Sequence, residues 1–228
     1  MIEDKRYAGF LFDMDGTLLD STAVIHRVWG RWASDHGFDP ERFIEKIHGI
    51  RAEDVISRLN LPDIDVAAEV RKVLAAETAD IDGIVSIVGA VAFLQSLPPD
   101  RWAIVTSAPR ELALRRLRSV EIDIPEILIT AEDVQFGKPD PECFRQGAAR
   151  LGLDPARCLV FEDAAAGIAA GEAAGSDVLV VAATHATVPP NRPFIRNYDE
   201  LGVDLDHRAG MRLFQTSSLG RDAHSLGN

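Results

Sequence analysis

The chain alternates between short apolar runs and longer segments with helical periodicity. Each apolar run is continuous and rich in Val, Ile, Leu and Phe, which is typical of strands buried on both faces of a parallel sheet. Because helical segments separate the runs, the pattern favours βαβ units. We therefore predict an α/β protein with a doubly wound, Rossmann-like parallel sheet. The expected strands are Tyr7–Phe12, Trp102–Thr106, Ile127–Thr130, Cys158–Phe161 and Val178–Ala182.

One long stretch breaks this alternation. Residues 20–79, between the first two expected strands, carry helical patterns almost throughout. A βαβ crossover needs only one helix, so we predict an α-helical cap at 20–79, inserted into a core made of 1–19 and 80–205. The alternative is a larger single domain with extra helices. Residues 206–228 lose apolar periodicity, and we expect a partly disordered C-terminal tail there, in which Arg208–Phe214 could dock as a short element. The expected cap helices are Ser21–His36, Pro40–His48, Arg51–Leu59 and Asp65–Ala79.

The charge of the chain limits the kinds of partner. With 36 acidic residues against 24 basic ones, the net charge is −12, which argues against nucleic acid and membrane surfaces as partners. No apolar run approaches the roughly 18–20 residues of a membrane span. We expect a cytoplasmic protein that is a monomer or a weak homo-oligomer. Its two cysteines, Cys143 and Cys158, are expected to be buried thiols.

Two aspartates follow the first expected strand, two positions apart. Asp13 and Asp15 precede Gly16, which permits a tight turn where the strand ends. Proteins of the α/β class bind ligands at the carboxyl ends of parallel strands. Two carboxylates so close together are costly to bury unless a cation lies between them, and oxygen ligands suit a hard ion such as Mg²⁺. A surface turn rich in Asp and Gly is the alternative.

Three further polar segments lie at strand ends or helix starts. Thr106 and Ser107 follow the second expected strand, where a hydroxyl and backbone N–H groups can hold phosphate oxygens. Lys138 lies just before a helix, where the helix dipole favours an anion. A bound anion would account for this lysine, and a solvated side chain is the alternative. Glu162 and Asp163 end the fourth expected strand.

In their order along the chain, these segments resemble the four signature motifs of the haloacid dehalogenase-like superfamily. The segments are DMDGTL, IVTSAP, GKPDPECF and FEDAAAGI, and the resemblance extends over nearly the whole chain up to about Leu201. The position of the expected cap resembles the subgroup that contains phosphoglycolate phosphatases, sugar phosphatases and β-phosphoglucomutases. The chain departs from the pattern at Ala164, where many relatives have Ser, and this puts one hydrogen bond near the metal site in doubt.

The resemblance implies a role for each residue of the motifs. Asp13 would be the nucleophile that forms an aspartyl-phosphate. Asp15 would be the general acid for the leaving alcohol and then the base for the attacking water. Mg²⁺ would bind the Asp13 carboxylate, the Asp15 carbonyl and Asp163, with Glu162 close by or contributing. The transferring phosphoryl oxygens would be held by Thr106, Lys138 and the backbone of Ser107.

The expected cap gives finer indications. In mutases that resemble β-phosphoglucomutase, a cap His lies ten residues after the second aspartate. Here that position is Ile25, and a helix turns its neighbour His26 by about 100°, so hydrolysis is favoured over mutase action. His48 and Arg51 resemble an HG-x-R segment of phosphatases for sugars, hexitols, 2-deoxyglucose 6-phosphate and glycerol phosphate. We expect both to contact the substrate; a helix-terminal His and a solvated Arg are the alternatives.

The sequence as a whole therefore predicts an Mg²⁺-dependent phosphomonoesterase for small sugar, polyol or glycerol phosphates. A phosphoglycolate phosphatase and a β-phosphoglucomutase-like enzyme are the alternatives within the same superfamily. A protein that holds a phosphorylated ligand without turnover is an alternative of another class. The presence of Asp13, Asp15, Lys138 and Asp163 together favours an enzyme.

Overall fold

A central parallel sheet forms the core of the protein. The structure is a computed structural model, and it describes residues 5–184, 192–206 and 210–216. Within these residues, six strands pair in parallel throughout, which confirms the predicted α/β sheet. In spatial order the strands are β5 (Leu128–Ile129), β4 (Trp102–Val105), β1 (Gly9–Phe12), β6 (Cys158–Glu162), β7 (Asp177–Val181) and β8 (Phe194–Ile195).

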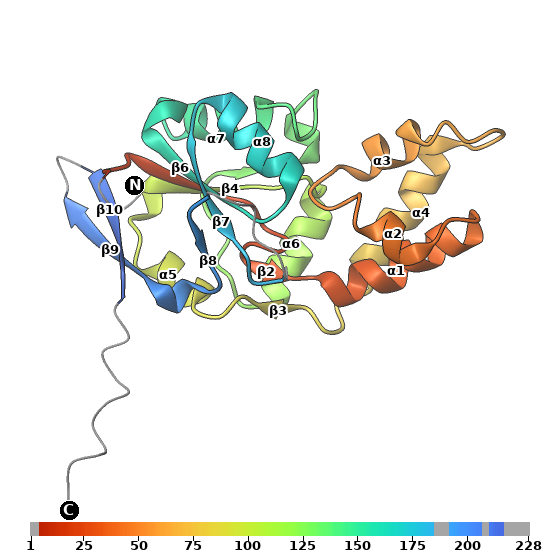
Figure 1. Cartoon of the computed structure of the whole chain (residues 1–228), viewed down its shortest axis with the longest axis horizontal. Coiled ribbons are helices and arrows are strands. Elements are labelled where there is room, and N and C mark those ends of the chain that lie inside the picture. The colour runs from red at the N-terminus through yellow and green to blue at the C-terminus, as the bar shows by residue number, and fades with distance from the viewer. Residues whose placement is uncertain (1–4, 185–191, 207–209, 217–228) are drawn as a thin grey trace, which may run out of the picture.

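Each face of the sheet carries its own hydrophobic layer, because successive residues of a strand point to opposite faces. In β1, Phe10 and Phe12 pack into one cluster and Leu11 packs into the other. All three side chains are fully buried, which explains why the run looks continuously apolar. Figure 1 shows helices on both faces. The first cluster is covered by α5 (Ala90–Gln95) and α6 (Arg110–Ser119), and the second by α7 (Glu142–Arg150) and α8 (Ala165–Ala174).

Four helices extend from one end of the sheet, on the right of Figure 1. They pack around a separate hydrophobic cluster that contains Trp29, Trp32 and Phe43. A short antiparallel ribbon joins them to the core, formed by β2 (Leu19–Asp20) and β3 (Val85–Ser86). This arrangement fits the expected helical cap, although the boundaries at 20 and 79 stay a prediction. The cap helices are α1 (Thr22–Asp35), α2 (Pro40–Ile44), α3 (Ala52–Arg58) and α4 (Val66–Ala79).

A hairpin closes the end of the molecule opposite the cap. Its strands are β9 (Leu201–Asp206) and β10 (Gly210–Gln215). In β10, Met211 and Leu213 are buried against the core, and Met211 exchanges two backbone hydrogen bonds of 2.8 Å with Tyr7. This strand overlaps 208–214, the part of the expected tail that could dock as a short element, and it belongs to the packed core. The rest of that tail, 207–209 and 217–228, lies outside the described residues.

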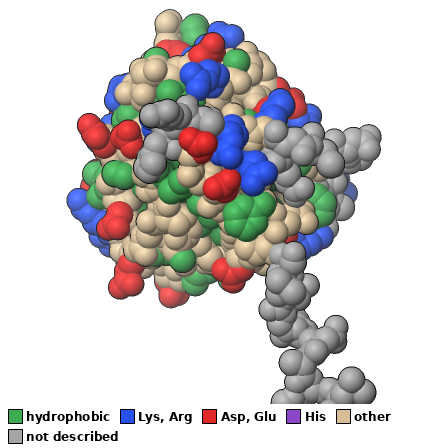
Figure 2. Space-filling view, turned by 90° about the vertical axis from the view of Figure 1, so that its left-hand side faces the viewer, with side chains coloured by type: hydrophobic (Ala, Val, Ile, Leu, Met, Phe, Trp, Pro, Cys, Tyr) green, Lys and Arg blue, Asp and Glu red, His purple; other side chains and the backbone are tan. Residues whose placement is uncertain are grey.

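The surface at the hairpin end carries charges of both signs. Figure 2 shows basic and acidic side chains interspersed there rather than gathered into one patch. Among them, Lys5 pairs with Asp177 at 2.7 Å and Arg6 pairs with Asp204 at 3.3 Å. Over the described ranges of the chain, no helix combines the length and the apolar character that crossing a bilayer requires.

Candidate active site

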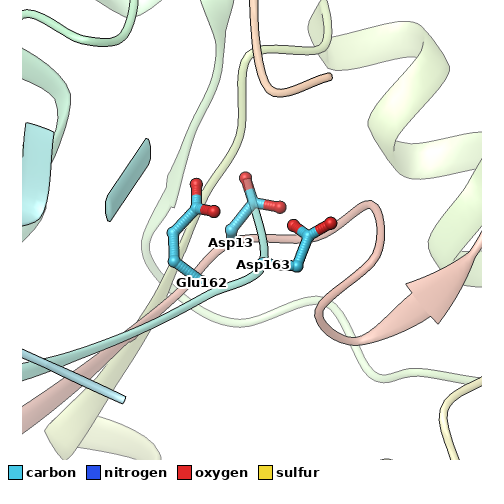
Figure 3. A group of neighbouring side chains, drawn as sticks. All are labelled: Asp13, Glu162 and Asp163. Carbon is cyan, nitrogen blue, oxygen red and sulfur yellow. The ribbon is translucent and has the colours of Figure 1, made fainter. Parts of the chain in front are cut away.

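The register of the sheet brings three acidic side chains to one edge. Phe12 in β1 pairs with Phe161 in β6, so Asp13 and Glu162 leave their strands side by side and Asp163 follows. One carboxylate oxygen from each acid lies within 4.8 Å of the others, and all three residues are buried. Figure 3 shows the three carboxyl groups gathered at this edge of the sheet.

Lys138 lies between two of these acids. Its Nζ donates hydrogen bonds to Asp13 Oδ1 at 2.5 Å and to Glu162 Oε1 at 2.8 Å. A third bond of 3.2 Å goes to the carbonyl oxygen of Val105 at the end of β4. Only 1% of the lysine is exposed. Burial alone would lower the pKa of Lys138, but the two carboxylates raise it, so the side chain is held as an ammonium. The alternative of a solvated lysine is therefore wrong.

Glu162 uses both of its carboxylate oxygens within the protein. Oε1 accepts from Lys138, and Oε2 accepts from the backbone N–H of Ala164 at 2.7 Å. The first turn of α8 passes so closely that a Cβ on Gly167 would lie 1.5 Å from Oε1. These contacts favour Glu162 as the residue that holds Lys138. Its role as a direct metal ligand stays a prediction.

Asp163 lies over the turn that follows β1. Thr17 donates its hydroxyl to Oδ1 at 3.4 Å. Gly16 adopts a left-handed conformation with φ of +82°, and a Cβ there would lie 2.0 Å from Asp163 Oδ2. Glycine is thus required both by the turn and by the close approach of the carboxylate. The alternative of a simple surface turn is wrong, because Asp13 and Asp163 are only 4% and 8% exposed.

The charges of this cluster fit a divalent cation. Three carboxylates against one ammonium leave two negative charges in a buried space. Burial raises the pKa of Asp13 well above its ordinary value, and the negative charges of Glu162 and Asp163 raise it further against the effect of Lys138. A hard divalent ion with oxygen ligands would remove this repulsion. The donor set therefore suits a metal such as Mg²⁺.

Asp15 is not one of the three clustered acids and belongs to a second network. Its Oδ1 accepts hydrogen bonds from the Ser21 hydroxyl at 2.6 Å and from Arg116 Nη1 at 2.8 Å. Arg116 also donates from Nη2 to Glu77 Oε1 at 2.8 Å. Glu77 belongs to the cap helix α4, whereas Arg116 belongs to the core helix α6.

Sequence reasoning missed this second network, although one signal was present. Leu112, Ala113 and Leu117 mark the apolar face of α6, and Arg116 falls on the same face by helical spacing. A charged residue on a buried face calls for a partner. The sequence could not supply that partner, since Glu77 lies 39 positions away and meets Arg116 only when the cap packs on the core.

The segment after β4 contacts both the core and the cap. Thr106 is 4% exposed, and its Oγ1 accepts a bond of 3.1 Å from the N–H of Ala108. Ser107 donates its hydroxyl to the carbonyl oxygen of Gly49 at 2.8 Å, which ties this segment to the cap. A Cβ on Gly49 would lie 2.8 Å from the Cβ of Ala164. The cap therefore packs tightly over Ala164.

The two cap residues expected to contact the substrate lie in different surroundings. His48 is on the wall of the cavity between cap and core. Arg51 is not among the described residues that line it. Its Nε donates to Asp54 at 2.7 Å and its Nη1 to the carbonyl oxygen of Gln135 in the core at 3.2 Å. The alternative of a solvated Arg51 is therefore wrong, and a substrate contact by either residue stays a prediction.

A cavity between the cap and the core brings the predicted chemistry together. The acidic edge of the sheet and the Thr106–Ser107 segment form its core side. The cap side is largely apolar but includes two titratable side chains. Ile25 lies on this wall, whereas His26 pairs with Glu41 at 3.6 Å and is 41% exposed. The cap residues on the wall include Ile25, Trp29, Ile47, His48, Leu74 and Glu77.

Comparison with known proteins agrees with this geometry. The model of the haloacid dehalogenase-like hydrolase family matches residues 7–175. Hexitol phosphatase A of Escherichia coli strain K12 is 39% identical, with 85% of this chain and 89% of that protein covered. Glycerol-1-phosphate phosphohydrolase 1 of Saccharomyces cerevisiae is 36% identical, with 76% and 74% covered. A hydrolase of Pseudomonas syringae has a similar crystal structure, with a TM-score of 0.72, 26% identity, and 82% and 93% covered.

The chain therefore belongs to the haloacid dehalogenase-like hydrolase family. Within that family it is a phosphatase, as its similarity to phosphatases over most of its length shows.

Proposed function

We propose that the protein hydrolyses small sugar, polyol or glycerol phosphates by way of a phosphorylated Asp13, with Mg²⁺ bound at the acidic edge of the sheet. One observation carries the proposal. Lys138 is held between Asp13 and Glu162 by bonds of 2.5 and 2.8 Å, and Asp13 and Asp163 line a cavity whose opposite wall is formed by the cap. This arrangement supports a reaction in which a carboxylate nucleophile, an ammonium group and a bound cation act on one phosphoryl group.

The reaction proceeds in two steps on the residues of this site. Asp13 attacks phosphorus, and the bond from phosphorus to the ester oxygen breaks. Asp15 gives a proton to that oxygen, so the product leaves as an alcohol. A water molecule then attacks the aspartyl-phosphate and gives its proton to Asp15, which releases phosphate and restores Asp13. Thr106 and Lys138 hold the phosphoryl oxygens during both steps, with the Ser107 backbone assisting.

The metal would be held by the Asp13 carboxylate, the Asp15 carbonyl and Asp163, with Glu162 close by. When bound, it neutralises charge on the phosphoryl oxygens. The protein residues do the remaining work: Lys138 holds Asp13 in place, and Gly16 lets Asp163 approach the turn after β1. The donor set supports a hard divalent ion, since it consists of oxygen atoms.

The cap wall supports polyols and sugars as the alcohol part of the substrate. Ile25, Trp29 and Leu74 offer apolar contact, and His48 is a polar group among them. Such a mixed wall suits a hydroxylated carbon chain. The relatives described above are named for a hexitol and for glycerol 1-phosphate, which supports the same class.

The alternatives fit less well. In mutases that resemble β-phosphoglucomutase the cap base lies ten residues after the second aspartate, but here Ile25 occupies that position and its neighbour His26 pairs with Glu41. Phosphoglycolate carries a second anion, yet Arg116 on the cavity wall already pairs with the carboxylates of Asp15 and Glu77. Cytoplasmic location and a monomeric or weakly associating state stay predictions of the sequence.

A panel of phosphate monoesters tests the proposal. We expect Mg²⁺-dependent phosphate release from hexitol, sugar and glycerol phosphates that exceeds release from phosphoglycolate. Asp13→Asn should abolish turnover, since an amide is not a nucleophile, whereas the exposed Asp35→Asn should behave as wild type. Near-normal turnover by Asp13→Asn would refute the role of Asp13. Tight binding of a phosphosugar by wild type without release of phosphate would instead favour the binding protein.

A further inference from the structure

Arg116 connects the cap to the residue proposed as the general acid. Its guanidinium donates to Asp15 Oδ1 and to Glu77 Oε1, each at 2.8 Å. The arginine and the glutamate are 3% and 5% exposed, so both charges are buried. A continuous polar path thus runs from the cap helix α4 through α6 to the loop after β1.

The contacts on Asp15 fix the direction of its carboxyl group. Ser21 and Arg116 both bond Oδ1. Within the described residues, no hydrogen bond engages Oδ2, and Asp15 lies on the cavity wall with 21% of its side chain exposed. Two donors on one oxygen leave the other oxygen for the reacting group. This is the orientation that proton transfer to a leaving oxygen in the cavity requires.

Arg116 depends on Glu77 for this geometry. Without Glu77, the buried guanidinium of Arg116 would have Asp15 as its single anionic partner. Its Nε already has no hydrogen-bond partner among the described residues. An unsatisfied buried donor costs about 1–3 kcal/mol, so loss of a second set of bonds would favour a different rotamer. Since Glu77 belongs to the cap, the second carboxylate is present only when the cap lies on the core as it does here.

We propose that Arg116 is a positioning residue that orients Asp15 for proton transfer, and that it does so only while Glu77 of the closed cap holds its other side. The proposal rests on the proposed function, because it concerns the same reaction. It adds a pair of residues that couple closure of the cap to the competence of the general acid. An ester bound under an open cap would meet the nucleophile Asp13 without a correctly oriented Asp15.

The leaving group of the substrate separates positioning from a merely structural role. An alkyl alkoxide needs a proton to depart, whereas 4-nitrophenolate is a stable anion that departs without one. The value of kcat/KM reports the steps up to departure of the alcohol and excludes hydrolysis of the aspartyl-phosphate. A defect in positioning Asp15 therefore lowers kcat/KM for glycerol 1-phosphate or a hexitol phosphate and spares 4-nitrophenyl phosphate.

The experiment compares Arg116→Met, Glu77→Gln and the control Arg115→Met, whose side chain is exposed on the same helix. We expect Arg116→Met to lower kcat/KM on the polyol phosphate by about 100-fold, the scale of a misplaced catalytic group, and on the aryl ester by less than about 3-fold. Glu77→Gln preserves shape and should lose several-fold on the polyol phosphate alone. Arg115→Met should match wild type on both esters.

Three outcomes would overturn the inference. If Glu77→Gln lowered kcat/KM equally for both esters, the contacts of Arg116 with Asp15 and Glu77 would have a structural role only. Wild-type rates for both variants on the polyol phosphate would show that Asp15 needs no such support. No turnover of either ester by the wild-type protein would remove the proposed function and this inference with it, whereas the first two outcomes leave the proposed function intact.

Discussion

Replacement of Lys138 by methionine tests the charge balance of the active site, because methionine fills a similar volume without the charge. Lys138 lies 2.5 Å from Asp13 and 2.8 Å from Glu162. With an effective dielectric constant of about 20, each contact is worth about 6 kcal/mol of gross Coulomb energy. The cost of burying the charges cancels most of this. Removal of one partner from a buried ion pair still leaves a net loss of about 3–5 kcal/mol in the free energy of unfolding.

The expected loss depends on pH in a defined direction. Burial raises the pKa of Asp13 and of Glu162, and Lys138 is the cation that lowers both. Without the lysine the two pKa values rise further. A carboxyl group whose pKa is higher in the folded than in the unfolded state binds more protons when folded, so stability falls as pH rises. The deficit of Lys138→Met relative to wild type should therefore be larger at pH 8 than at pH 5.

Urea unfolding of both proteins in excess EDTA measures the deficit without bound metal. The exposed Lys46→Met is the control, and it should stay within about 0.5 kcal/mol of wild type. Activity is measured on the same samples after Mg²⁺ is restored, and Lys138→Met should be inactive. If Lys138→Met unfolds within 1 kcal/mol of wild type at pH 8, the lysine does not balance the buried carboxylates and the reasoning is refuted.

Three further predictions follow from single contacts. Gly16→Ala should lower kcat/KM at least about 10-fold and weaken Mg²⁺ binding measured by calorimetry. The new Cβ would displace the Asp163 carboxylate, and the positive φ of this position strains any residue other than glycine. Asp133→Asn should lower the free energy of unfolding by about 2 kcal/mol at pH 7. Burial opposes the charge of Asp133, but hydrogen bonds from Thr130 lower its pKa to about 2. In thermal unfolding, the difference from wild type should therefore vanish as pH falls from about 4 to 2. Tyr198→Phe should cost about 1 kcal/mol in urea unfolding with activity unchanged, since it removes one buried hydroxyl bond.

The strands of the core could be predicted because they are buried on both faces. A run such as Phe10–Phe12 supplies side chains to both hydrophobic layers, so it contains no polar position and is easily seen in the sequence. Of the cap helices, α1 and α4 have 14 residues each and show helical periodicity in the sequence. The other two, α2 and α3, have 5 and 7 residues and are shorter than the expected segments. The acidic edge followed from the strands, because the carboxyl ends of adjacent parallel strands meet at one edge of the sheet.

Elements without a sequence period were missed. The ribbon of β2 and β3 has two residues in each strand, and two residues cannot display alternation. In β10, Met211 and Leu213 alternate with the exposed Arg212 and Phe214, but one short alternating segment predicts neither a strand nor the place where it docks. Contacts between cap and core, such as that of Arg51 with the carbonyl of Gln135, depend on tertiary packing that no local pattern encodes.

The two buried cations of the site differ in what they join. Lys138 links Asp13 to Glu162, and all three residues belong to the sheet edge and its loops. That arrangement does not depend on the cap. Arg116 has the same kind of surroundings, one cation between two carboxylates, but one of these carboxylates belongs to the cap. Movement about the β2–β3 ribbon would therefore leave the nucleophile as it is and change the surroundings of the proposed acid. Since hydrolysis of a sugar phosphate needs both groups, the fit of the cap around the alcohol, rather than the strength of the phosphate contacts, should decide which esters are turned over quickly.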